Sequence, residues 1–269
     1  NAFEGRNLHF GVRELGMGAI MNGLQLHGGL RVFGATFLVF ADYVRPATRL
    51  AALMNLPVVY VYTHDSFFVG EDGPTHQPVE TLMSLRVIPN VTVIRPSDAT
   101  ETKAAWMAAL ENKTGPTALL LTRQNLPIFD RSELAPASKL NKGAYTIWEN
   151  ATSDHDILIA ASGSEVWISI DAAKKLGQEG HKVRVISFPS WELFEQQDDV
   201  YKESIFPPSC RTRLAVEAGW PTGWEKYVGL DGDILGIDHF GASAPSGILA
   251  EKFGITTDAV YKRAKGLLN

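Results

Sequence analysis

The first half of the chain alternates between amphipathic segments and short apolar runs. Residues 12–26 are apolar along one side and end at Gly28, which is typical of a helix stop. Residues 58–62 are β-branched or aromatic, which is typical of a buried parallel strand. The pattern predicts helices at 12–26, 43–54, from 79 onward and at 100–111, and strands at 31–40, 58–62, 91–94 and 117–122. Pro46 fits the second of these helices only if it lies in the first turn.

The alternation weakens and then restarts in the second half. Residues 131–150, which include Pro136, are the predicted linker. Beyond it, strands are predicted at 156–161, 182–187, 213–218 and 233–237, and helices at 165–178, 246–253 and 257–267. Strands alternating with helices indicate parallel sheets with helical crossovers. The sequence therefore predicts an α/β protein of two domains, 1–130 and 151–269, each a mostly parallel sheet flanked by helices.

Composition narrows the class of protein. The 269 residues carry a formal net charge of −5, which argues against nonspecific nucleic-acid binding. No apolar run reaches the roughly 18 residues of a membrane helix, so no membrane partner is expected. Cys210 is the single cysteine, which excludes an internal disulfide and favours a reducing compartment, the cytoplasm. The chain begins at Asn1 without a methionine or a leader, so we expect it to be part of a longer polypeptide.

Candidate chemistry is densest in residues 63–78, Thr-His-Asp-Ser-Phe-Phe-Val-Gly-Glu-Asp-Gly-Pro-Thr-His-Gln-Pro. This loop follows a predicted buried strand, and ligands of open parallel sheets bind at the carboxyl ends of strands. His64, Asp72 and His76 could therefore bind a ligand. A solvated turn whose carboxylates cap the next helix is an alternative. A metal site is a weaker one, because one loop shows few oxygen ligands, and no metal-binding residue is predicted.

Other candidates lie at the ends of predicted elements. Glu14 begins a helix among apolar neighbours, either as a charge–dipole contact or as a proton-shuttling carboxylate. Phe37, Phe40 and Tyr43 are spaced by three past a strand, either as core side chains or as a wall for a planar ring. Arg123 ends another strand, either as a surface charge or as a phosphate ligand.

Taken in order, these blocks resemble one family. Residues 9–17, 36–43, 63–78 and 122–127 resemble the pyrimidine-binding domain of transketolase, and the Gly-Glu-Asp-Gly-Pro-Thr-His-Gln-Pro run is highly specific. Ser-Gly-Ser-Glu-Val at 162–166 and the closing Glu-Lys-Phe-Gly-Ile-Thr are similar to the C-terminal domain of that family. The resemblance implies an enzyme of the pentose phosphate pathway that uses thiamine diphosphate. It would transfer a two-carbon ketol group from a ketose phosphate to an aldose phosphate.

The resemblance also implies how the cofactor is held. Glu14 would hydrogen-bond the pyrimidine ring of thiamine diphosphate and activate it, and Phe37, Phe40 and Tyr43 would line the ring's pocket. The diphosphate and its magnesium or calcium ion belong to a different domain, and the active sites lie at a homodimer interface. No diphosphate motif is present in this sequence, so the chain alone is expected to be inactive.

Four residues match the family's substrate positions: His64, Asp72, His76 and Arg123. The resemblance implies that His64 and Arg123 bind the sugar phosphate. Asp72 would bind the hydroxyl beside the acceptor carbonyl, and His76 the reacting carbonyl oxygen. The family often has a small aliphatic residue and glycine where this chain has Phe67 and Phe68. These bulky rings could narrow the channel or pack against a neighbouring loop.

Other functions stay open at this point. Dihydroxyacetone synthase, 1-deoxyxylulose-5-phosphate synthase and the pyruvate dehydrogenase β subunit use the same cofactor. The set of His64, Asp72, His76 and Arg123 suits a phosphorylated polyhydroxy sugar, which disfavours the enzymes that act on 2-oxo acids. A noncatalytic fragment that binds partners through its dimer face is an alternative of another class, and Glu14 disfavours it.

Overall fold

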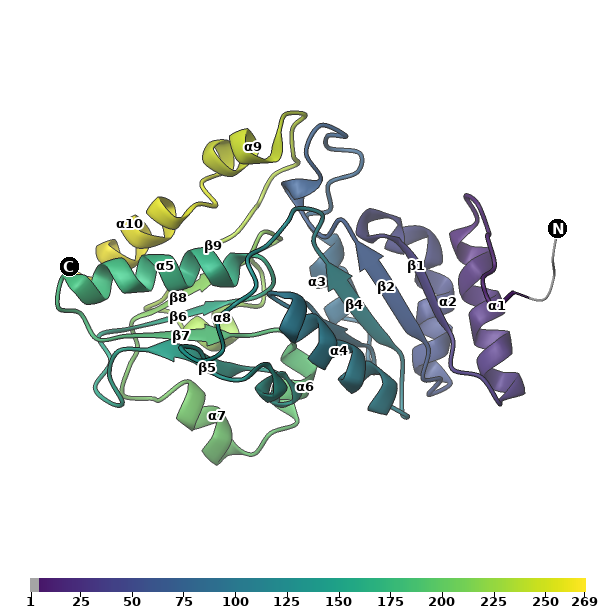
Figure 1. Cartoon of the computed structure of the whole chain (residues 1–269), viewed down its shortest axis with the longest axis horizontal. Coiled ribbons are helices and arrows are strands. Elements are labelled where there is room, and N and C mark those ends of the chain that lie inside the picture. Colours follow the sequence, from purple (N-terminus) through teal and green to yellow (C-terminus); the bar gives the residue numbers. More distant parts are fainter. Residues whose placement is uncertain (1–4) are drawn as a thin grey trace.

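The computed structural model describes residues 5–269, which form two α/β domains lying side by side (Figure 1). The first sheet has four parallel strands in the order β1-β2-β4-β3. Their bounds are Phe33–Phe37 (β1), Val59–Thr63 (β2), Thr92–Ile94 (β3) and Thr117–Leu121 (β4). All-parallel pairing confirms the crossover connections that the alternating pattern predicts.

Helices cover both faces of the first sheet. One face is covered by α1 (Glu14–His27), α2 (Ala41–Leu53) and α3 (Thr81–Arg86), and the other by α4 (Ala99–Glu111). Alternate residues of β2 serve the two cores: Tyr60 packs with the first group and Val61 with α4. Pro46 is the sixth residue of α2, so it lies deeper than the predicted first turn. Two short 3₁₀ helices, Leu38–Phe40 (η1) and Phe67–Val69 (η2), follow β1 and β2.

The second sheet has five strands in the order β5-β7-β6-β8-β9. Their bounds are Tyr145–Glu149 (β5), Ile157–Ala161 (β6), Val183–Ser187 (β7), Arg213–Val216 (β8) and Asp233–Leu235 (β9). One face packs against α5 (Glu165–Gln178), α9 (Ser246–Phe253) and α10 (Thr257–Leu268). The other packs against α6 (Trp191–Glu195), α7 (Asp199–Ile205) and α8 (Glu225–Val228). These three short helices are absent from the predicted elements.

The predicted linker contains structure that belongs to the second sheet. Residues 131–150 include the 3₁₀ helix Ala137–Lys142 (η3) and the edge strand β5. β5 pairs antiparallel with β7, so the second sheet is mostly but not wholly parallel. The linker assignment is therefore wrong for β5, because the pairing depends on a strand far along the chain. No helix of residues 5–269 is long and apolar enough to cross a membrane.

Buried ion pairs join the two domains. The Arg86 guanidinium donates to both oxygens of Glu217 over 2.7 and 2.8 Å, and both side chains are 2% exposed. Glu217 also accepts from the Trp224 indole at 2.9 Å and from the Ser162 hydroxyl at 2.5 Å. Burial raises the pKa of Glu217, but the charge and hydrogen bonds of Arg86, the charge of Arg95 and the Ser162 hydrogen bond outweigh burial and bring the pKa to about 2. The interface therefore holds an ionised carboxylate.

We expect this carboxylate to make the domain interface sensitive to acid. The pKa of Glu217 is depressed from the ordinary 4.5 to about 2, so its contribution is complete above pH 4.5 and is lost as the pH falls toward 2. That contribution is about 3 kcal/mol. In Glu217→Gln, the free energy of unfolding should fall by about 3–5 kcal/mol at pH 7, because Arg86 loses its counter-charge.

Urea unfolding of both proteins from pH 7 down to the lowest pH at which they fold tests this expectation. The difference between wild type and Glu217→Gln should shrink as the pH drops below 4.5. Glu251→Gln, a change on the exposed surface of α9, is the matched control and should leave the curve unchanged. If the difference between the two free energies of unfolding stays constant with pH, the partners of Glu217 do not depress its pKa.

Candidate active site

The predicted site residues gather at one edge of the first sheet. Phe37 pairs with Thr63, and Thr63 with Leu121, so β1, β2 and β4 end level with one another. His64 directly follows β2, and Arg123 lies two residues beyond β4. Because the strands are parallel, these ends share the edge where open α/β sheets bind ligands.

Five aromatic rings at this edge form a connected cluster, here called the aromatic row. Phe37 stacks on His64 with 3.5 Å between ring centroids and 17° between planes. Phe37 and Phe40 are 6.2 Å apart, and Phe40 and Tyr43 are 6.0 Å apart, both stacked. His76 meets Phe40 edge-on at 5.6 Å. The row therefore joins the predicted cofactor-binding aromatics to both predicted substrate-binding histidines.

His64 lies among charges that shift its proton affinity. Its pKa is lowered, first because the ring is partly buried and next because the Arg123 charge disfavours an imidazolium. Asp72 and Asp65 act in the opposite direction. Nδ1 of His64 lies 2.9 Å from the Thr63 hydroxyl oxygen. At neutral pH the ring is therefore neutral, with one nitrogen able to donate and the other able to accept.

Glu14 lies on a different element from the residues of the aromatic row. It is the first residue of α1, and five residues separate the end of α1 from β1, so the helix runs back along the sheet. The Glu14 end of α1 therefore lies at the carboxyl ends of the strands (Figure 1). The carboxylate is half-buried and makes no hydrogen bond or ion pair within residues 5–269. The structure places Glu14 at the same edge of the sheet as the other candidates, without a hydrogen bond or ion pair to any of them.

Residues 63–78 form a loop in which the polar side chains of Asp65 and Gln77 are buried. Gln77 donates to the carbonyl oxygens of Gly70 at 2.8 Å and Ala242 at 2.9 Å, and it accepts from the Ala242 amide at 3.0 Å. Asp65 is 3% exposed, whereas Asp72 is exposed. Helix α3 begins without a side-chain cap, so no carboxylate of the loop caps it. The sequence pattern gave no sign that Asp65 and Gln77 are supports, because polarity alone does not reveal burial.

The two phenylalanines that depart from the family's usual residues face the second domain. Phe67 is 1% exposed and meets Phe253 of α9 edge-on at 5.2 Å. Phe68 stacks on Phe67 with 4.3 Å between centroids and packs on the core of the second domain. Of the two expected effects, the structure therefore shows packing against a neighbouring element.

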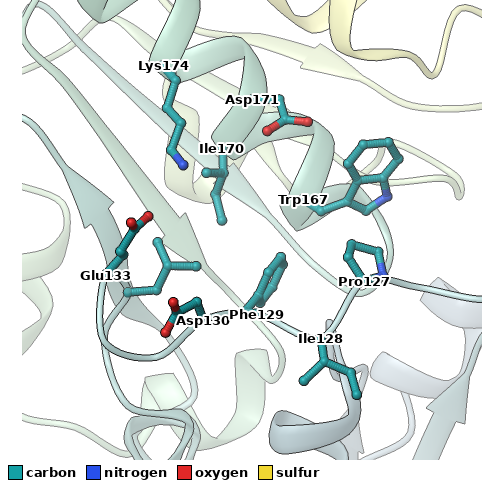
Figure 2. Close-up of a pocket in the computed structure, with 10 residues that line it drawn as sticks. Pro127, Ile128, Phe129, Asp130, Glu133, Trp167, Ile170, Asp171 and Lys174 are labelled. Atoms are coloured by element: carbon teal, nitrogen blue, oxygen red, sulfur yellow. The ribbon is translucent and has the colours of Figure 1, made fainter.

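A separate cavity of about 380 Å³ lies between residues 127–134 and α5 (Figure 2). Phe129, Trp167 and Ile170 line it, and none of the predicted site residues does. Within residues 5–269, no three His, Cys, Asp or Glu side chains are grouped to hold a metal ion. The candidate site is thus the open sheet edge that carries the aromatic row.

Two family models match consecutive parts of the chain. Residues 1–128 match the model of the transketolase pyrimidine-binding domain, and residues 143–256 match that of the transketolase-like TK C-terminal domain. The chain belongs to the transketolase family. This membership confirms the resemblance of the sequence blocks, and it implies thiamine diphosphate as the family's cofactor.

Two curated relatives illustrate the similarity of this transketolase-family chain. The transketolase of Bacillus subtilis is 53% identical over 267 residues, which are 99% of this chain and 40% of the relative. The transketolase of Halalkalibacterium halodurans is 55% identical over 266 residues, which are 99% of this chain and 40% of that relative. The chain therefore spans about two fifths of the length of these relatives.

Solved structures share the fold. Transketolase from Leishmania mexicana superposes with a TM-score of 0.90 at 46% identity, over 96% of this chain and 37% of that one. A Pichia stipitis transketolase in complex with sedoheptulose-7-phosphate superposes with a TM-score of 0.89 at 42% identity, over 96% of this chain and 37% of that one. A split-gene transketolase described as an inactive β4 tetramer gives 0.75 at 23% identity, over 96% and 82%, which shows likeness of fold alone.

The charges around His64 predict opposite effects of two substitutions. Arg123→Ala should raise the pKa of His64, because the positive charge that disfavours the imidazolium is removed. Asp72→Asn should lower it further, because a favourable negative charge is lost. NMR titration of the His64 imidazole measures both shifts. Arg211→Ala, at an exposed ion pair with Asp231, is the control and should shift nothing. An unchanged His64 pKa in Arg123→Ala would refute the proximity of the two groups.

Proposed function

We propose that this chain supplies the pyrimidine side of a thiamine-diphosphate-dependent ketol-transfer site. The reaction is that of transketolase: a two-carbon ketol group passes from a ketose phosphate to an aldose phosphate. The aromatic row carries this proposal, because it links the candidate ring-binding residues Phe40 and Tyr43 to His64 and His76 at one sheet edge. The family membership supports it.

The residues present fit the ring of the cofactor. Phe37, Phe40 and Tyr43 offer a row of nearly parallel rings, and Tyr43 is 64% exposed, which suits a planar aromatic ligand. Glu14 is half-buried at the same edge, where it would hold a proton shared with a pyrimidine nitrogen. When bound, thiamine diphosphate supplies the nucleophilic carbon that adds to the ketose carbonyl. The diphosphate and a magnesium or calcium ion would be held by a domain other than the two described.

The other candidates suit a phosphorylated sugar. Arg123 is exposed beside His64, and its planar guanidinium can donate two parallel hydrogen bonds to a phosphate. Neutral His64 can bind the same group without adding charge. Asp72 would accept from the hydroxyl beside the acceptor carbonyl. His76, held by a 2.9 Å contact between Nδ1 and the Thr75 hydroxyl oxygen, would keep Nε2 for the carbonyl oxygen.

We further propose that the active enzyme is a homodimer in the cytoplasm. Helices α1 and α2 and strand β1 lie at one end of the molecule (Figure 1). They carry large exposed apolar side chains, among them Leu26 at 57%, Phe33 at 64% and Leu53 at 68%. Such a surface suits burial against another subunit. Cys210, a free buried thiol, is compatible with a reducing compartment.

The proposed phosphate role of Arg123 predicts a substrate-dependent loss. In the enzyme completed with its diphosphate-binding domain, Arg123→Ala should lower kcat/KM for phosphorylated sugars about 10–150-fold, mostly through KM, because a charge-assisted hydrogen bond contributes about 1.5–3 kcal/mol. Glycolaldehyde, an acceptor without phosphate, should be nearly unaffected. Steady-state kinetics with both acceptors measure the two effects. Equal losses on both acceptors would rule out phosphate binding by Arg123.

The proposed role of Glu14 predicts a loss before any sugar binds. Glu14→Gln in the completed enzyme should slow exchange of the thiamine C2 proton for deuterium by about 10²–10⁴-fold. The fold should survive, because a helix-start charge contact is worth only about 0.3–1 kcal/mol. Quenched-flow NMR and thermal melts measure exchange and stability.

Asp258→Asn, which removes another helix-start carboxylate on α10, is the matched control for Glu14→Gln. It should leave C2 exchange at the wild-type rate. If Glu14→Gln exchanges normally and only melts earlier, Glu14 has a structural role and the proposed function loses its activating residue.

A further inference from the structure

The second domain packs against and hydrogen-bonds to the loop at residues 63–78, which carries three of the candidate substrate residues. We propose that Arg95 is a positioning residue: through Asp65 it fixes His64 against the second domain, so that this domain sets the geometry of the substrate site. The inference rests on the proposed function in one respect, namely that His64 binds substrate.

The bridge through Arg95 is short and buried. Arg95 directly follows β3, and its Nε donates to Asp65 Oδ2 at 2.7 Å, with side-chain exposures of 0% and 1%. Its Nη1 donates to the Ser162 carbonyl oxygen at 2.9 Å, the Ser162 hydroxyl at 3.1 Å and the Glu165 carboxylate. One guanidinium therefore joins the loop of the first domain to the start of α5 in the second.

The Ser-Gly-Ser-Glu-Val block is shaped for this arginine. Gly163 has φ +56, and a Cβ there would lie 2.6 Å from Cζ of Arg95. Only glycine lets the backbone approach the guanidinium so closely. The Gly163 amide also donates to the Arg95 carbonyl at 3.1 Å. This block, similar to the family's C-terminal domain, is used here to hold an arginine of the first domain.

Because the Arg95–Asp65 pair is buried, it depends on both side chains being charged. Burial lowers the pKa of Arg95, but the Asp65 and Glu165 carboxylates outweigh burial, so the guanidinium stays protonated and its net pKa is raised. A buried charge that loses its partner is strongly destabilising. Asp65 therefore has little freedom to leave Arg95.

The bridge acts on His64 through one peptide bond. His64 has φ +60, in the left-handed region that few non-glycine residues adopt. Strain of this kind persists only where the neighbours hold the backbone. Thr63 is fixed in β2 by pairing with Phe37 and Leu121, and Asp65 is fixed by Arg95. The imidazole is thereby held on the Phe37 ring.

Further contacts hold the rest of the loop. Gln77 bonds to Ala242, and the Ser243 hydroxyl donates to the Glu71 carbonyl at 2.5 Å. The loop after β2 lies next to the segment before α9 (Figure 1). The loop is thus held before and after its exposed Asp72, which suits a rigid substrate wall.

Asp65→Asn tests the inference because it keeps the shape and removes the charge. Hydrogen exchange of the amides of residues 64–77 should speed up at least about 10-fold, as local opening becomes easier. The chemical shifts of the His64 ring protons should also change, because the imidazole would no longer be held stacked on the Phe37 ring. In the completed enzyme, kcat/KM for phosphorylated sugars should fall by about 10²-fold, the scale of a misplaced binding group.

Arg131→Lys is the matched control, because Arg131–Asp98 is also an ion pair between the domains, with the Asp98 side chain 0% exposed, but neither residue bonds to Arg95 or to the loop within residues 5–269. It should lower the melting temperature while loop exchange and the His64 signal stay as in wild type. Equal effects of Asp65→Asn and Arg131→Lys on loop exchange and on the His64 signal would overturn the inference, since general loosening of the domain interface would explain both. Unchanged exchange in Asp65→Asn would overturn it too.

Arg95→Lys keeps the test decisive if Asp65→Asn does not fold, because it retains the buried positive charge. It loses the planar guanidinium that reaches Asp65, Ser162 and Glu165 together, so it should also speed loop exchange and shift the His64 signal, and no change would overturn the inference. The exchange and NMR measurements do not depend on activity. An inactive completed wild-type enzyme would therefore refute the proposed function, while these measurements still decide whether the second domain positions His64.

Discussion

A fully buried guanidinium is the constraint on which the rest of this structure depends. Arg95 must keep its counter-charges, and these come from Asp65 in the first domain and Glu165 in the second. Separating the domains would take the Glu165 carboxylate away from Arg95, which would keep only Asp65 as a partner. Arg86 and Glu217 repeat the arrangement nearby. The two domains are thus joined by paired charges as well as by apolar packing.

A second buried polar cluster reinforces this junction. Glu101 of α4 accepts from the Tyr145 hydroxyl at 2.5 Å and from the Ser187 hydroxyl at 2.7 Å, both on strands of the second sheet. Asp98, which caps the same helix, pairs with Arg131 at 2.9 Å. Such networks require fixed geometry, because each buried polar group needs its own partner. The relative placement of the domains is therefore specified by directional contacts.

This junction ties the second domain to candidate site residues that all lie on the first. All eight candidate residues belong to the first domain. The loop among them packs its apolar side, Phe67 and Phe68, into the core of the second domain. Its polar side, with Asp72 and His76, faces the sheet edge where the aromatic row lies. One loop thus has a face that packs on the second domain and a face that carries two of the candidate substrate residues.

The sequence by itself determined the architecture and the location of the candidate site. Alternating helical and apolar segments predicted parallel sheets, and the bounds of α5 and α9 agree with the predicted ranges 165–178 and 246–253. Parallel strands end at a common edge, so residues placed after strands, such as His64 and Arg123, had to come together there. These inferences needed only local pattern and topology.

Tertiary structure alone decided which polar residues are buried and what they pair with. Asp65 and Asp72 lie in one polar loop, yet one holds Arg95 and the other is exposed. Gln77 and β5 find partners far along the chain, in Ala242 and β7. Burial and pairing depend on groups that are distant in sequence, and local periodicity carries no information about them.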